Sequence, residues 1–199
     1  ILYAVFIIFL DKTANSRTAE AIIAMLIVIH LLSIIMQRNW FHKMMVLFTS
    51  GAFLLCVGIP FIGSYLYIHK PELFLQHDGT MLSRIQLTTT FYLRNGGFGF
   101  YGFPIEDQDC LDMMFSYIGL HWGTAAFIII SAAIIYAICK ASREQHTSFL
   151  ILLFFFLVYG WAEVAPIYPV YSYLSLLLGY YIMNRKPFYC KRPYTCANF

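Results

Sequence analysis

Three arginines of this chain, Arg17, Arg84 and Arg94, carry the side chain best suited to hold a phosphate or diphosphate group. A planar guanidinium makes two parallel, charge-assisted hydrogen bonds to such an anion, which an ammonium group cannot do. On a helix, the spacing of Arg84 and Arg94 separates them by about 15 Å along the axis and by about 80° around it. The pattern predicts either convergence on a diphosphate or separate contacts with lipid headgroups, which long basic side chains also reach.

Two carboxylates stand at the edges of apolar segments and are candidate bases. Asp112 precedes a long apolar run, and Glu163 follows another. A carboxylate within hydrogen-bond reach can take the proton of a sugar hydroxyl, and ionisable groups at the rim of a membrane are functional candidates. Capping of the following helix is the structural alternative for Asp112. We therefore expect Arg17, Arg84, Asp112 and Glu163 to be catalytic.

Aromatic residues are concentrated in the glycine-rich segment Asn95–Gly102 and just after it. Their rings suit either stacking on sugars or the headgroup depth of a membrane, where Tyr and Trp are enriched. We expect Arg94, Tyr101 and Tyr117 to contact a substrate. No histidine pair has the spacing of a metal site on a helix, and there is no phosphate-binding loop or dinucleotide fingerprint. The sequence therefore predicts no metal, no cofactor and no nucleic-acid partner.

Composition indicates the elements that must position these residues. Of the 199 residues, 60% are apolar and 12% are charged, and the mean hydropathy is +0.70. A soluble domain averages about 25% charged residues, and a helix crossing a bilayer needs about 20 apolar ones. The fold class predicted is an all-α, polytopic transmembrane protein with about five full spans. The expected spans are 19–36, 44–68, 112–139, 148–162 and 170–183, after a partial one at 1–10.

Charge is distributed unevenly between the segments that separate the apolar runs. Eight of the thirteen Lys and Arg, with Glu144 as the one acid, occupy 37–43, 140–147 and the tail from Asn184. Nine of the ten acids occupy the alternate segments. Because Lys and Arg mark the cytoplasmic side, loop 69–111 is predicted to be external. Within it, Thr80–Arg94 predicts an amphipathic helix in the membrane interface, with Met81, Ile85 and Thr88 or Thr89 on one stripe.

The apolar start of the chain is too short to span a bilayer. Ile1–Leu10 also lacks the basic region and the cleavage site of a secretory signal. We expect residues 1–199 to form a single membrane domain that is the C-terminal part of a larger polytopic protein. The five cysteines indicate no disulfide framework, since Cys110 is the one cysteine in an external segment.

Several short motifs occur in an order that resembles a known family. They are Asn15-Ser16-Arg17-Thr18-Ala19, Leu82-Ser83-Arg84-Ile85, Phe98-Gly99, Leu111-Asp112 before Tyr117 and Gly123, and Ala162-Glu163 before a Pro- and Tyr-rich turn. In this order they resemble the C-terminal half of Wzy-type polysaccharide polymerases of capsule, exopolysaccharide and O-antigen synthesis. The chain departs from the family pattern at Ser83, where Gly is usual before the arginine, and at Met113, where Asn is common.

The resemblance implies a glycosyltransferase that joins undecaprenyl-diphosphate-linked oligosaccharide repeats at the outer face of the bacterial cytoplasmic membrane. It implies that Arg17 and Arg84 stabilise the departing diphosphate, while Asp112 or Glu163 activates the acceptor. Membrane lipids, and a flippase and a chain-length regulator of the same pathway, are the implied partners. The alternatives are a non-catalytic or transporter-like subunit of polysaccharide export, or an inactive truncated polymerase. A transporter should carry charges at mid-span, whereas these apolar runs are almost free of charge.

Overall fold

The computed structural model describes residues 17–74, 80–105, 111, 113–162 and 173–183. In these ranges every regular element is a helix, which confirms the all-α prediction. The longer helices are α2 (Arg17–Ile35), α3 (Arg38–His69), α4 (Thr80–Arg94), α6 (Thr124–Glu144), α7 (Thr147–Ala162) and α8 (Tyr173–Met183). Three short ones, η1 (Pro71–Leu73), α5 (Met114–Tyr117) and the π-helical turn η2 (Ile118–Trp122), complete the set.

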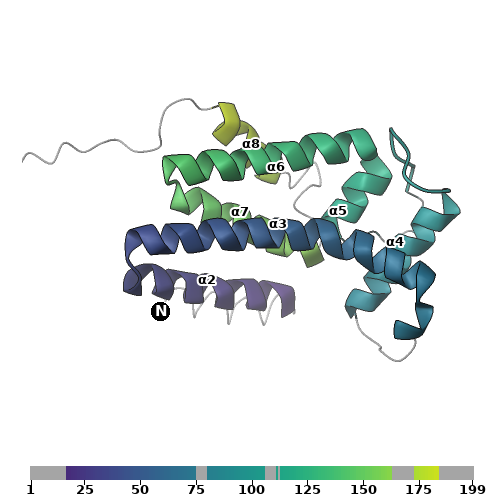
Figure 1. Cartoon of the computed structure of the whole chain (residues 1–199), viewed down its shortest axis with the longest axis horizontal. Helices are drawn as coiled ribbons and strands as arrows, with labels where there is room; N and C mark the ends of the chain where they lie inside the picture. The colour runs from purple at the N-terminus through teal and green to yellow at the C-terminus, as the bar shows by residue number, and fades with distance from the viewer. Residues whose placement is uncertain (1–16, 75–79, 106–110, 112, 163–172, 184–199) are drawn as a thin grey trace, which may run out of the picture.

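Helix α3 runs the length of the molecule, with α2 on one side of it and α6 on the other (Figure 1). Its most extensive packing is against α7. The chain turns from α2 to α3 and from α6 to α7 at one end of the molecule. At the other end, α4, α5 and the described part of the loop between them, 95–105, gather around the last turns of α3. The molecule thus has two distinct ends joined by long helices.

The core lies between α3 and α7 and follows a helical stripe of small and medium side chains. Met45, Thr49 and Cys56 are buried on α3 at the spacing that keeps side chains on one helix face. The Thr49 hydroxyl lies 3.1 Å from the Leu150 carbonyl oxygen, and the Cys56 thiol lies 2.9 Å from that of Leu157. The Thr49 hydroxyl also lies 2.7 Å from the Met45 carbonyl oxygen of its own helix, so it and the Cys56 thiol both have acceptors inside the core.

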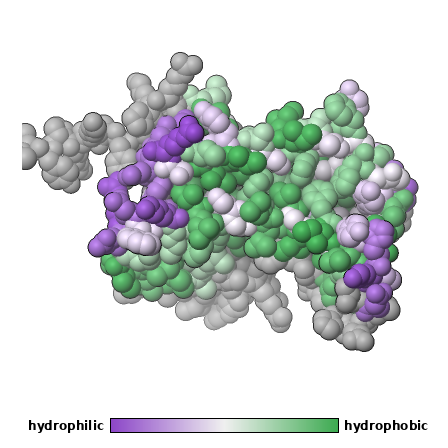
Figure 2. All heavy atoms as spheres, viewed as in Figure 1, coloured by the Kyte–Doolittle hydropathy of each residue, from purple (hydrophilic) through white to green (hydrophobic). Residues whose placement is uncertain are grey.

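Two of the described helices, α3 and α6, are long and apolar enough to cross a membrane. Helix α7 is apolar but shorter. Their outward side chains are apolar as well, with Leu47, Leu54 and Ile62 exposed on α3 and Ile128 and Ile129 exposed on α6. Figure 2 shows this apolar face across the middle of the molecule, with polar residues concentrated toward its ends. A large exposed apolar face of this kind marks contact with lipid or with another protein.

The expected apolar segment 112–139 is not one helix, so this part of the prediction is wrong. Helix α5 continues into η2, which ends at Trp122, and α6 begins at Thr124 after Gly123. Gly123 has a φ of +91°, a conformation that interrupts a right-handed helix. The described part of the last expected span, α8, has 11 residues, which is short of the roughly 20 that a crossing needs.

The predicted helix Thr80–Arg94 is confirmed as α4. Its stripe of Ile85, Thr88 and Thr89 is buried. Ile85 lies over Gly63 of α3 so closely that a Cβ at Gly63 would come within 2.8 Å of the Ile85 Cδ1. The apolar stripe of α4 therefore packs against the protein. Other side chains of α4, such as Leu87 and Leu93, are exposed on the surface of the molecule.

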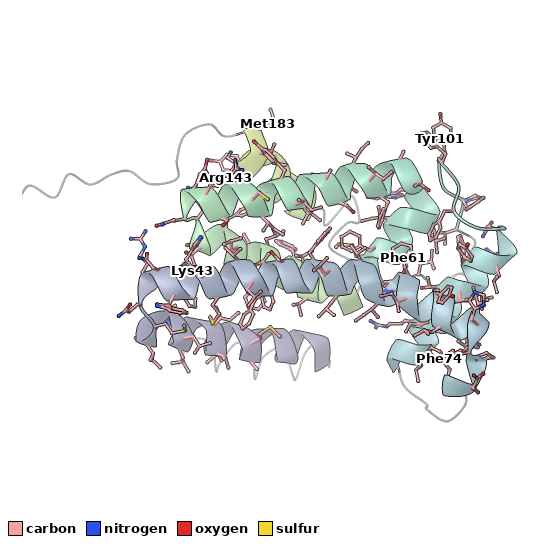
Figure 3. The ribbon with its side chains drawn as sticks, in the orientation of Figure 1. Lys43, Phe61, Phe74, Tyr101, Arg143 and Met183 are labelled. Carbon is pink, nitrogen blue, oxygen red and sulfur yellow. The ribbon has the colours of Figure 1, made fainter. Side chains whose placement is uncertain are left out.

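Figure 3 places Lys43 and Arg143 near one end of the molecule, and Phe74 and Tyr101 near the other. Segments 37–43 and 140–147 therefore share an end, and the described parts of loop 69–111 lie opposite. Alternate connecting segments of a polytopic chain must lie at opposite ends of its helices, and this grouping agrees with that requirement. Which end faces the cytoplasm stays a prediction from the charges.

Candidate functional site

A cavity of about 320 Å³ lies at the end of the molecule formed by α3, α4 and the α5–η2 segment, and we call it the end cavity. Helix α3 contributes one face of its last turns, and α4 contributes Thr88 and Tyr92, which are one turn apart. The complete lining is Phe61, Ser64, Tyr65, Ile68, His69, Thr88, Tyr92, Phe98, Ser116 and Leu120. This combination of rings and hydroxyls in a concave site is typical of ligand pockets.

Two buried hydroxyls in the end cavity distinguish it from ordinary packing. The Oγ atoms of Ser64 and Ser116 are buried and have no hydrogen-bond partner in the described part of the chain. Ser116 is 1% exposed. Because a buried hydroxyl without a partner costs about 1–3 kcal/mol, such groups call for a structural or functional reason. A bound molecule that carries hydroxyls or waters would supply the missing partners.

Aromatic rings line the same cavity as the two serines. Phe98 contacts the Phe61 ring at 5.2 Å and the Tyr92 ring at 5.0 Å between centroids. The Tyr65 ring packs on His69 at 4.4 Å. The described lining contains no Asp, Glu, Lys or Arg, so its hydrogen-bonding groups are neutral hydroxyls and one imidazole. An uncharged, hydroxyl-rich ligand with an apolar ring face matches this arrangement better than an anion does.

Phe98 reaches the cavity because its glycine-rich loop is bound to the interruption at Gly123. The backbone N–H groups of Thr124 and Phe103 donate to the carbonyls of Gly99 and Leu120, at 3.0 and 2.9 Å. Gly102 also has positive φ, and a Cβ on it or on Gly123 would overlap the backbone of the opposite segment. The interruption thus creates the surface on which the loop rests.

The predicted site residues occupy different places. Arg84 is partly buried with a buried Nε, one turn of α4 before Thr88, and it does not line the end cavity. Arg94 is exposed, with its guanidinium 5.1 Å from the centre of the Phe91 ring. Tyr101 is 86% exposed at the tip of the loop. Tyr117 is partly buried beside His121, with ring centroids 4.8 Å apart.

Other predicted catalytic residues lie outside what the structure describes. Asp112 and Glu163 are outside the described residues, and Arg17 is described only as the first residue of α2. Whether these groups converge with Arg84 therefore stays a prediction. No cluster of three or more His, Cys, Asp or Glu that could hold a metal occurs within the described ranges.

The sequence analysis missed Ser64, Thr88 and Ser116 as site residues. A lone hydroxyl in an apolar run usually bonds its own helix, so the sequence gives these residues no distinguishing signal. Their lack of partners, in the case of Ser64 and Ser116, appears only when the helices are assembled. Comparison with known proteins supplies no relative: no family model, curated protein or solved structure matches this chain.

Proposed function

We propose that this protein is a polytopic membrane enzyme, with about five spans, that extends a polysaccharide from lipid-diphosphate-linked repeats. The reaction breaks the bond between the growing glycan and its diphosphate and forms a bond to a hydroxyl of the next repeat. The diphosphate leaves, and the hydroxyl proton passes to a base. The substrate is a lipid-linked oligosaccharide, and the site is at the outer face of the cytoplasmic membrane.

The observation that carries this proposal is the end cavity with its two unpartnered serine hydroxyls among aromatic rings. A sugar presents hydroxyls at its rim and C–H groups on its ring faces. The hydroxyls would pair with Ser64 and Ser116, and the ring faces would pack on Phe61, Tyr92 or Phe98. A volume of about 320 Å³ is within the range of small-molecule sites, about 300–1,000 Å³.

In this proposal, the arginines stabilise the negative charge of the departing diphosphate. Arg84 lies one turn of α4 before the cavity residue Thr88, and in this proposal its guanidinium holds the diphosphate attached to a sugar in the cavity. Arg17 is the second expected donor, and Asp112 or Glu163 is the expected base. Donors aimed at developing negative charge supply much of the rate in reactions of this type.

Substitution of the two cavity serines tests the proposal. Ser64→Ala and Ser116→Ala should each lower polymer yield about threefold to tenfold, which corresponds to one net hydrogen bond. The measurement is polymer amount and length on gels, from cells with matched levels of each variant. Because the hydroxyls are unpartnered in the free protein, both variants should be at least as heat-stable as the original chain.

Ser131→Ala is the matched control, since Ser131 also has a buried, unpartnered hydroxyl in the described structure but lies on α6 outside the cavity. It should leave the polymer unchanged. Normal polymer from both cavity variants would contradict a glycan site in the end cavity. Polymer of normal length in cells that lack this protein would favour the non-catalytic alternative.

A further inference from the structure

A second, smaller hollow adjoins the end cavity, and we call it the side hollow. It has a volume of about 150 Å³ and is lined by Phe61, Phe98, Gly119, Thr124 and Phe127. Phe61 and Phe98 belong to both linings, so their two rings, 5.2 Å apart, form the partition between the spaces. The two spaces are therefore neighbours that share one wall.

The side hollow differs from the end cavity in its chemistry. Three of its five residues are phenylalanines and one is glycine. The hydroxyl of Thr124 donates to the Gly99 carbonyl at 3.2 Å, so its proton is already engaged. The lining therefore offers no free side-chain hydroxyl to pair with the hydroxyls of a sugar, and it matches a hydrocarbon group.

The position of the side hollow is also suited to a hydrocarbon. Phe61 comes from α3 and Phe127 from α6, which are the two helices long and apolar enough to cross a membrane. Figure 3 shows Phe61 in the space between these helices. The residues next to the lining, Ile62 and Ile128, are 61% and 60% exposed. The lining residues Phe61 and Phe127 are therefore next in sequence to side chains of the exposed apolar face.

We propose that the side hollow binds the first part of the hydrocarbon chain of a lipid whose sugar occupies the end cavity, with the linking diphosphate outside both spaces at the edge of the Phe61–Phe98 partition. This inference rests on the proposed function, because it assigns the two spaces to two parts of one lipid-linked substrate. The surrounding lipid is as apolar as the hollow, so the contribution comes from packing and shape. The Phe61–Phe98 partition then separates the sugar from the chain.

Gly119 provides a direct way to fill the side hollow. A Cβ at this position would lie 3.5 Å from Phe98, 3.6 Å from Phe61 and 3.7 Å from Phe127, all ordinary contacts. Gly119→Ala is therefore compatible with the fold, and Gly119→Val takes up more of the space. Gly51→Ala and Gly51→Val are matched controls, since a Cβ at Gly51 meets nothing within 4 Å.

The experiment uses the full chain in lipid nanodiscs and a photoreactive probe. The probe is a long-chain alcohol with a diazirine on its alkyl chain and no sugar or phosphate. Mass spectrometry compares labelling of Phe127 with that of Ile129, which is 68% exposed on the same helix and reports contact with bulk lipid. Gly119→Val should lower the ratio of Phe127 to Ile129 labelling at least about threefold, because the space is filled, and Gly119→Ala should lower it less. The Gly51 variants should leave the ratio unchanged.

The outcomes separate this inference from the proposed function. An equal labelling ratio in the original chain and both Gly119 variants would overturn the side hollow as a chain site. That result would leave the glycan site untouched, since the serine variants test it independently. Conversely, a ratio that falls in the Gly119 variants, together with normal polymer from the serine variants, would retain the chain site and reject the glycan site.

Discussion

Arg84 is the residue on which the proposed chemistry depends most. Its Nε is buried, whereas Arg94 is exposed and lies against Phe91. An arginine that serves only to reach headgroups needs a positive charge and a long stem, which lysine also has. An arginine that holds a diphosphate needs its planar fork. The two roles therefore respond differently to a conservative substitution.

Arg84→Lys should abolish or severely reduce chain extension and leave membrane insertion intact. Loss of one charge-stabilising donor typically lowers the rate by about 10²–10³. The measurement is polymer length on a gel at matched protein levels. Arg143→Lys, at the opposite end of the molecule, is the control and should change nothing. Long polymer from the Arg84→Lys chain would remove the main support for the diphosphate role.

At the scale of elements, the interrupted segment α5–η2–α6 and its docked loop form one unit. Gly123 ends η2 with positive φ, and Gly102 packs directly against it. The loop then delivers Phe98 to the partition between the end cavity and the side hollow. A side chain at either glycine would separate the loop from the helix.

Gly123→Ala should destabilise the protein by about 2 kcal/mol or more, from backbone strain and from overlap with the Phe100 carbonyl and the Gly102 amide. Thermal unfolding in detergent measures this loss. Gly51→Ala is the control, and its expected change in stability has the opposite sign. It places a methyl in open space on α3 and should stabilise the helix by about 0.5–1 kcal/mol. Equal unfolding temperatures for the two variants would contradict this account of the interruption.

Lys140 attaches α8 to α6 near the basic end of the molecule. Its Nζ donates to the Tyr181 carbonyl at 2.8 Å and lies 4.9 Å from the centre of the Tyr181 ring. The Tyr181 hydroxyl donates to Glu144 at 3.2 Å. The last carbonyls of a helix lack partners within it, so a cation at this point satisfies them and favours the helix dipole.

Lys140→Met should therefore destabilise the chain by about 1.5 kcal/mol, the lower range for a hydrogen bond to a charged group. Thermal unfolding and limited proteolysis of α8 would both report the loss. Lys43→Met is the matched control at the same end, because Lys43 is exposed and its Nζ lies 5.9 Å from the centre of the Trp40 ring. The assignment is contradicted if both methionine variants unfold at the temperature of the original chain.

At the scale of the whole molecule, the two ends differ in charge and in chemistry. Segments 37–43 and 140–147, at the end with Lys43 and Arg143, hold four Lys and Arg against one acid, and the other end carries the end cavity. Because Lys and Arg are retained on the cytoplasmic side, the end cavity is expected to face outward. That orientation is what a reaction on exported, lipid-linked glycans requires.

Cysteine labelling from outside tests the orientation. A membrane-impermeant thiol reagent should modify Cys110 and spare Cys190 and Cys196, which the charge pattern places on the cytoplasmic side. Single-cysteine chains in intact cells make the comparison direct. Cys56 is the negative control, since it is buried against α7. Modification of the tail cysteines with protection of Cys110 would reverse the topology and move the proposed site to the cytoplasm.

Local pattern alone determined much of this protein. The helix Thr80–Arg94 and the helical character of the apolar runs follow from composition and periodicity, which act over a few turns of chain. The separation of basic and acidic segments also needs no fold, because it depends on the order of charges between the runs. These features were predictable since each depends on neighbours in sequence.

Assembly of the fold decided the rest. The break at Gly123 is stabilised by a loop about twenty residues earlier in the chain, and the unpartnered state of Ser64 and Ser116 depends on how α3, α4 and α5 pack. The hydrogen bonds that make the interruption tolerable come from a distant segment. The apolar run by itself therefore looks like one continuous helix. The end cavity and the side hollow exist only between elements, so no single stretch of sequence contains them.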